Sequence, residues 1–159
     1  AQYAAELVSL LIEEHDPHPD LFDHLQNCLQ SLSTTTLEQS FLAFQIELLR
    51  ETGYLPELST CTSCGREIAT SGANQISFSP DRGGVLCRNC EPSFPQRFTL
   101  NSRLLGIMQL FTTNGTARLP ILTRHQTDPI NKLLAEYIEH TLGRRLRLPK
   151  YILGRTQTG

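Results

Sequence analysis

Four cysteines form two C-x-x-C pairs, Cys61 with Cys64 and Cys87 with Cys90, and twenty-two residues separate the pairs. Each pair places two thiols on one tight turn, so two such turns that face each other make a four-sulfur cage. Zn²⁺ favours this tetrahedral arrangement when all its ligands are thiolates, with Zn–S distances of about 2.3 Å. The pattern therefore predicts one structural Zn²⁺ bound by these four residues.

Two other interpretations of the cysteines are weaker. A single C-x-x-C also suits a redox dithiol, but two matched pairs favour a metal. Two disulfides in a secreted domain would leave Cys28 as an odd fifth cysteine, and the chain has no disulfide framework elsewhere. Gly65 follows the first pair and Gly83-Gly84 precedes the second, which favours turns beside both pairs.

A four-sulfur site leaves no coordination position open for water or substrate, so the expected metal is a scaffold rather than a catalyst. Residues 59–92 hold few large apolar side chains, and structural zinc supplies on the order of 10 kcal/mol of folding free energy to such modules. None of the five histidines has the spacing of a second metal site. Cys28 lies on an apolar helix face, where a cysteine packs as a small hydrophobic residue rather than acting as a nucleophile. Because the sequence also has no nucleotide-binding or paired-carboxylate motif, it predicts a protein that is not an enzyme.

Apolar residues at helical spacing mark three early segments. The first covers residues 1–14, and the second, described below, begins after it. The third runs from a capping box at Thr35 to Gly53. Because its apolar residues cover more than one stripe, the third segment is expected to be the central helix. The second begins at Pro19. Its expected apolar face consists of Leu21, Phe22, Leu25, Cys28, Leu29 and Leu32.

Beyond the first cysteine pair, residues 75–79 alternate like a short strand, 81–84 favour a turn, and 85–86 return toward the second pair. A helix is expected over about 99–113. The last helix is expected to begin at Asp128-Pro129 and to end at Gly143.

These elements predict a mainly α protein, a helical bundle with an inserted four-cysteine zinc finger. We expect 1–58 to hold the N-terminal helices, 59–92 the finger, and 93–159 the C-terminal helices with a basic tail. The chain starts without Met and within a helical pattern, so we expect it to be a piece of a longer protein.

Charge is divided unevenly along the chain. Residues 1–57 carry one base and ten acids, a net charge of −9, and residues 58–159 carry thirteen bases and six acids, a net charge of +7. The excess of bases indicates a polyanionic partner, although solvated or mutually docked surfaces would explain it equally well. The proposed phosphate contacts cluster past the last helix, at Arg144, Arg145, Arg147 and Lys150. No apolar run is long enough to span a membrane.

Two segments together resemble the C-terminal region of the bacterial RecO family of recombination mediators. The first is residues 47–56, ELLRETGYLP, which lead directly into Cys61-x-x-Cys64-Gly65. The second is Phe78-Ser79-Pro80 followed by Gly83-Gly84-Val85-Leu86-Cys87-x-x-Cys90. The resemblance extends in order over essentially all of the chain.

The resemblance implies a treble-clef-like finger of the Arf-GAP type within the bundle, and a cytoplasmic, nucleoid-associated role in DNA repair and recombination. It implies single- and double-stranded DNA as partners, bound mainly by an N-terminal OB-fold domain that this chain lacks. It also implies strand annealing, recombinase loading, and binding to RecR and to the C-terminal tail of single-stranded DNA-binding protein.

An acidic, apolar tail of that kind needs an apolar pocket rimmed by a base. Candidate residues for this groove are Arg103, Leu104, Ile107, Phe111 and Tyr137, with Arg144 a further candidate for the rim. Two alternatives stay open: a structural zinc-knuckle interaction module with no nucleic-acid role, and an Arf-GAP-like GTPase activator. Arg97 lies in a Pro/Phe-rich stretch that does not match the catalytic arginine of those activators.

Overall fold

The structure is a computed structural model that describes residues 2–12, 19–31, 37–69, 75–114, 121–143 and 145–146. The chain divides into two compact units. One combines Ala1–Gly53 with Pro120–Gly159, and the other is the intervening segment Tyr54–Leu119. We describe each unit by itself.

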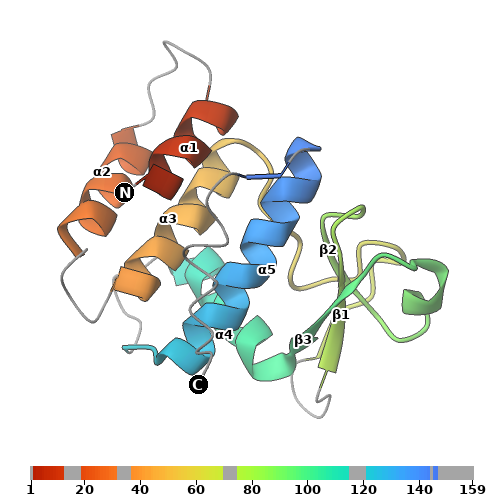
Figure 1. Ribbon diagram of the computed structural model, residues 1–159. Coiled ribbons are helices and arrows are strands. Elements are labelled where there is room, and N and C mark those ends of the chain that lie inside the picture. The colour runs from red at the N-terminus through yellow and green to blue at the C-terminus, as the bar shows by residue number, and fades with distance from the viewer. Residues whose placement is uncertain are drawn as a thin grey trace, which may run out of the picture. The chain divides into compact units, whose positions relative to one another are not determined.

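The first unit is helical. Its described elements are α1 (Gln2–Leu11), α2 (Pro19–Gln30), α3 (Leu37–Glu51) and α5 (Arg124–Leu142) (Figure 1). Helix α3 contacts the other three helices, and most of its residues from Phe41 to Leu49 are buried. The prediction that this helix is central is therefore confirmed. Gly53 follows it with φ of 75°, a left-handed conformation that suits a helix end.

A buried polar pair links α3 to α5. The side-chain amide of Gln45 donates to Asn131 Oδ1 at 2.7 Å, and Asn131 Nδ2 donates to the carbonyl oxygen of Glu38 at 3.3 Å. Gln45 and Asn131 are almost fully buried, so this pairing fixes the register of the two helices. At the edge of the same interface, Arg124 and Glu38 form an ion pair at 2.7 Å.

Helix α5 begins at Arg124, four residues before Asp128. The prediction that it starts at Asp128-Pro129 was therefore wrong. Thr123 and Gln126 form a capping box, in which the Thr123 N–H donates to Gln126 Oε1 at 2.9 Å. This cap starts the helix at Arg124. Pro129 lies inside the helix close to its N-terminus. The expected end at Gly143 is confirmed by its left-handed φ of 63°.

The apolar face of α2 is narrower than expected. Leu21 and Cys28 are buried, whereas the side chains of Phe22 and Leu29 are exposed. The two exposed residues therefore do not belong to the core, and that part of the prediction was wrong. Leu32 and the Thr35 capping box lie outside the described residues.

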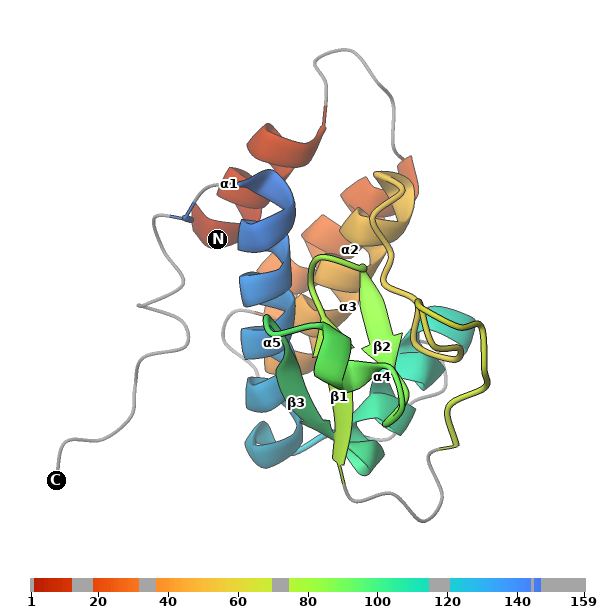
Figure 2. The ribbon, with the colours of Figure 1, turned by 90° about the vertical axis from the view of Figure 1, so that its right-hand side faces the viewer.

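The second unit contains a small sheet of β1 (Gln75–Ser79), β2 (Gly84–Leu86) and β3 (Phe98–Asn101). All pairings are antiparallel, and β1 lies in the middle (Figure 2). Ser77 is opposite Leu86 on one side and Thr99 on the other. Helix α4 (Ser102–Asn114) contacts β1 and β3. Residues from sheet and helix share the core, namely Phe78, Val85, Leu86, Leu105, Met108 and Phe111.

The expected helix over about 99–113 begins later, because Phe98–Asn101 forms β3. Pairing with the middle strand extends this segment up to Asn101. Asn101 Oδ1 then accepts a hydrogen bond from the Arg103 N–H at 2.8 Å, which satisfies one free donor at the start of α4. The strand at 75–79 and the return at 85–86 occur where the sequence predicts them.

The described part of the chain is mainly α-helical with a cysteine knuckle, as expected. Helix α4 lies in the same compact unit as the sheet and the cysteines. The finer division into 1–58, 59–92 and 93–159 stays a prediction.

Candidate metal centre

The first cysteine pair lies on a tight loop that closes on itself. Thr60 and Glu67 form an antiparallel bridge, and within it the Cys61 N–H donates to the Arg66 carbonyl at 2.7 Å. The Gly65 N–H donates back to the Cys61 carbonyl at 2.8 Å. Gly65 has φ of 72°, which a residue with a side chain rarely adopts. The loop therefore holds both thiols of the pair on one turn.

The second pair follows β2 directly. The N–H groups of Cys90 and Glu91 both donate to the Cys87 carbonyl at 3.0 Å, which makes a turn that leads into the short 3-10 helix η2 (Glu91–Ser93). The Ser77 hydroxyl on the middle strand donates to Glu91 Oε2 at 2.5 Å. This contact ties the far end of the turn to the sheet.

A close backbone approach brings the two turns together. Glu57 forms a parallel bridge with Gly84, in which the Glu57 N–H donates to Gly83 and the Val85 N–H donates to the Glu57 carbonyl, both at 2.9 Å. A Cβ atom at Gly84 would collide with the Glu57 carbonyl oxygen and lie 2.8 Å from Thr62 Cγ2. The approach therefore requires glycine. The Thr62 N–H donates to the Val85 carbonyl at 3.0 Å and continues the pairing to the first turn.

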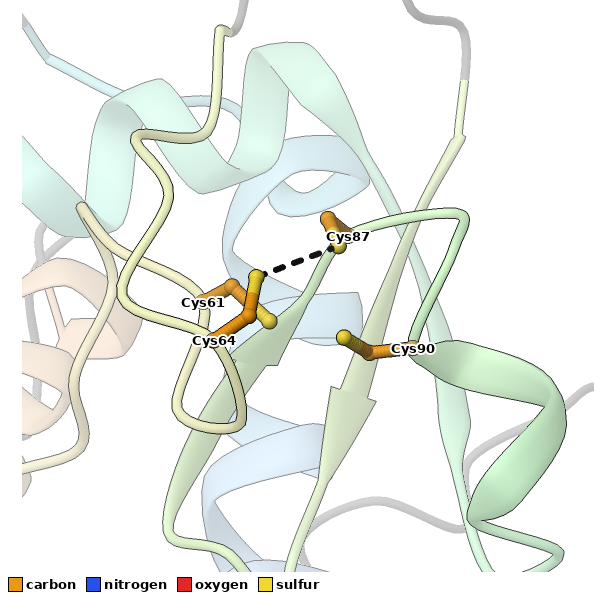
Figure 3. Close-up of side chains that lie close together, drawn as sticks. All are labelled: Cys61, Cys64, Cys87 and Cys90. Carbon is orange, nitrogen blue, oxygen red and sulfur yellow. Dashed lines mark hydrogen bonds between the residues drawn. The ribbon is translucent and has the colours of Figure 1, made fainter.

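The four sulfur atoms converge where the turns meet (Figure 3). All four lie within 4.8 Å of one another, and the Sγ atoms of Cys64 and Cys87 are 3.7 Å apart. A tetrahedral zinc with Zn–S bonds of about 2.3 Å requires S···S separations of roughly 3.8 Å. The donor set therefore fits Zn²⁺. All five cysteines of the chain are free thiols, so the disulfide interpretation is not supported.

The site already favours a thiolate at one position. Burial alone would raise the pKa of Cys61, but backbone N–H groups donate to its sulfur and lower its pKa to about 6. These N–H groups belong to Ser63, Cys64 and Cys87. At Cys90, the Ser63 hydroxyl lowers the pKa, but hydrogen bonds with the other three thiols outweigh it and the pKa is raised to about 11. Cys61 therefore favours the thiolate and Cys90 favours the thiol.

The other predicted site residues are spread over both units. In the basic tail, Arg145 is exposed, whereas Arg144, Arg147 and Lys150 lie outside the described residues. Of the predicted groove residues, Arg103, Leu104, Ile107 and Phe111 lie on α4 and Tyr137 lies on α5, in different units. Phe111 and Tyr137 are buried. Their grouping into one groove stays a prediction.

Sequence reasoning did not identify the residues that align the two cysteine turns. Gly84 was expected only to form a turn, whereas it also admits the Glu57 backbone. The two consecutive glycines before the second pair could have indicated this close backbone approach, because a simple turn needs only one glycine.

The family model that matches this chain and the relatives named below all belong to one protein family. Residues 1–149 match the family model described as Recombination protein O C terminal. The DNA repair protein RecO of Anaeromyxobacter dehalogenans (strain 2CP-C) is 32% identical over 155 residues, which cover 96% of this chain and 60% of the relative. The RecO protein of Rhodopirellula baltica is 38% identical over 92 residues, 57% of this chain and 34% of the relative.

A third relative, the RecO protein of Myxococcus xanthus, is 29% identical over 148 residues, which cover 92% of this chain and 58% of the relative. The chain spans about 60% of the length of the Anaeromyxobacter relatives it matches. Within the described residues, no helix is long and apolar enough to cross a bilayer.

Proposed function

Since the chain belongs to the RecO C-terminal family, we propose that it is the C-terminal part of a DNA repair protein that mediates recombination. The observation that carries this proposal is the family match over residues 1–149. The relatives compared above are named DNA repair proteins, and the chain covers 60% of the length of the Anaeromyxobacter ones. We further propose that the remainder of the longer protein supplies the main DNA-binding domain.

In this proposal, Cys61, Cys64, Cys87 and Cys90 bind one Zn²⁺, which supplies four metal–thiolate bonds that hold the two turns together. The convergence of the four sulfurs within 4.8 Å supports this role. Four protein ligands fill a tetrahedral site and leave no position for water, so the metal stabilises the fold rather than a reaction. The proposed role of the chain is therefore non-catalytic.

The proposed partners are DNA, RecR and the C-terminal tail of single-stranded DNA-binding protein, in the bacterial cytoplasm and at the nucleoid. Strand annealing and recombinase loading are the activities that the longer protein would perform. The basic tail supports a phosphate contact, and its described member Arg145 is exposed. The apolar residues of α4 with Arg103 at the rim are the proposed dock for the acidic tail.

The test uses the longer protein that contains this chain. We expect it to bind about one Zn²⁺, to bind single-stranded DNA, and to accelerate annealing of complementary oligonucleotides. The Cys87→Ser variant should lose the metal and lose its response to the partner proteins. If the parent carries zinc but neither binds nor anneals DNA, the proposal is wrong and a zinc-knuckle interaction module is the better account.

A further inference from the structure

The basic side chains of the described part of the second unit are all arginines, and all are exposed. They are Arg66, Arg82, Arg88, Arg97 and Arg103. We refer to Arg82, Arg88 and Arg97 as the knuckle arginines; they lie in the β1–β2 turn, in the second cysteine turn and after η2, respectively. Arginine rather than lysine suits a planar, two-pronged contact with an oxyanion such as phosphate.

Arg82 is held in place by neutral groups. Its Nη2 donates to the Thr62 carbonyl at 3.1 Å, and its guanidinium carbon lies 5.9 Å from the centre of the Phe94 ring. A guanidinium has five N–H donors, so this one hydrogen bond leaves four for a ligand. The side chain is therefore both oriented and available.

Arg97 is anchored on the same aromatic residue. Its Nη1 donates to the carbonyl oxygens of Phe94 at 3.0 Å and Glu91 at 3.4 Å. Two guanidinium groups thus gather around Phe94, and neither forms an ion pair with a carboxylate among the described residues. Both guanidinium groups are exposed, so their remaining N–H donors can reach an anion outside the chain.

Arg88 is the third knuckle arginine. It lies inside the second turn, between Cys87 and Cys90, and its side chain is exposed. The three cations therefore come from the β1–β2 turn, the second cysteine turn and the segment that follows η2. The contacts of Arg82 with Thr62 and Phe94 connect the β1–β2 turn to the first cysteine turn and to the end of η2.

We propose that the knuckle arginines bind the phosphate backbone of a single-stranded nucleic acid without sequence preference. This inference rests on the proposed DNA repair function and gives it a contact surface separate from the basic tail. A strand presents regularly spaced oxyanions, which match several fixed guanidinium groups better than one isolated anion does.

One competing role for the arginines is electrostatic. A zinc ion with four thiolates has a net charge of about −2, and Arg82 is bound to Thr62, beside Cys61. The arginines would then offset the charge of the cluster and have no external ligand. The two roles differ in their salt dependence, because only contacts to an outside polyanion release counterions.

The test measures fluorescence anisotropy of labelled oligothymidylate and oligoadenylate with the zinc-loaded chain, between about 50 and 200 mM salt. The variants are Arg82→Gln, Arg88→Gln and Arg97→Gln, each of which removes one positive charge. The matched control is Lys132→Gln, which removes one charge from an exposed position on α5 in the other unit. Zinc content is measured for every variant.

We expect each knuckle variant to weaken binding to both oligonucleotides alike, and to reduce the slope of log affinity against log salt by ~0.7. The control should keep the parent slope. Arg82→Lys should keep most of the slope, because it keeps the charge, but should bind more weakly, because it loses the fork held by Thr62 and Phe94.

Three results would overturn the inference. If the parent binds the oligonucleotides but the three variants keep its affinity and slope, the contact lies elsewhere, and the proposed repair function still stands. If the variants lose zinc and keep the slope, the arginines serve the cluster charge. If polyglutamate displaces the oligonucleotides at equal charge, the surface takes acidic peptides instead. Failure of the longer protein to bind or anneal DNA is a separate result, and it concerns the proposed function.

Discussion

Replacing Gly84 with alanine should disrupt the metal centre without touching any ligand. The new Cβ would collide with the Glu57 carbonyl oxygen, a backbone atom that cannot rotate away, and would lie 2.8 Å from Thr62 Cγ2. Relief of the clash requires the two chains to separate. That separation breaks the two hydrogen bonds of 2.9 Å that flank Gly84, each of which contributes about 1 kcal/mol.

Overpacking by the new methyl group adds about 1–3 kcal/mol, part of which is relieved as the hydrogen bonds break. The folding free energy of the knuckle should therefore fall by about 2–4 kcal/mol. Because zinc binding and folding of the knuckle are coupled, this loss should appear as a zinc affinity about 30- to 800-fold weaker. The assay is competition for zinc with a chromophoric chelator, together with urea unfolding of the zinc-loaded chain.

The matched control is Gly106→Ala on α4, in the same unit. A Cβ there meets nothing within 4 Å, so the change should leave zinc affinity unchanged and stabilise the helix by about 0.5–1 kcal/mol. If Gly84→Ala binds zinc within threefold of the parent, the bridge between Glu57 and Gly84 does not align the turns, and our account of the site fails.

Three further predictions concern the ligands, the pH dependence and the helical unit. Cys87→Ser should abolish stoichiometric zinc binding while circular dichroism retains the helices of the first unit; collapse of all helicity would contradict this. As pH falls, protons compete with zinc for the thiolates. Because the pKa of Cys61 is about 6, its thiolate takes up a proton only below that pH, so the plot of log zinc affinity against pH should become steeper there by ~1 proton. A constant slope through that range would show that Cys61 is not the low-pKa thiol. Asn131→Leu should cost about 1–3 kcal/mol in urea unfolding, because it leaves the buried Gln45 amide without its acceptor, and adding Gln45→Leu should recover most of the loss.

Local signals predicted the elements that local interactions determine. The period of apolar residues located α2 and α3, and alternation located the strand at Gln75–Ser79. The two cysteine pairs predicted the cluster, because four sulfurs on two tight turns have few other arrangements. Each of these signals lies within a few residues of the feature it predicts.

The features that the sequence did not predict depend on distant partners. Residues Phe98–Asn101 became a strand because they pair with β1 across the chain, whereas their apolar spacing continued into α4 and favoured a helix. Phe22 and Leu29 have the periodicity of a core face, but the packing of α2 buries a narrower stripe. Helix α4 joined the sheet through contacts that no local pattern encodes.

The placement of the second unit within the first has an effect on chain entropy. Residues 54–119 interrupt the helical unit between α3 and α5, which must pack together across that insertion. An unfolded insertion is a long loop whose ends must be brought together, and a folded one replaces it with a fixed span. On the loop-closure scale each doubling of loop length costs about 0.6 kcal/mol, so a fixed span that shortens the effective loop roughly tenfold is worth about 2 kcal/mol. If Zn²⁺ binds as proposed and folds the second unit, it should therefore also stabilise the first unit, by a route that requires no contact between them.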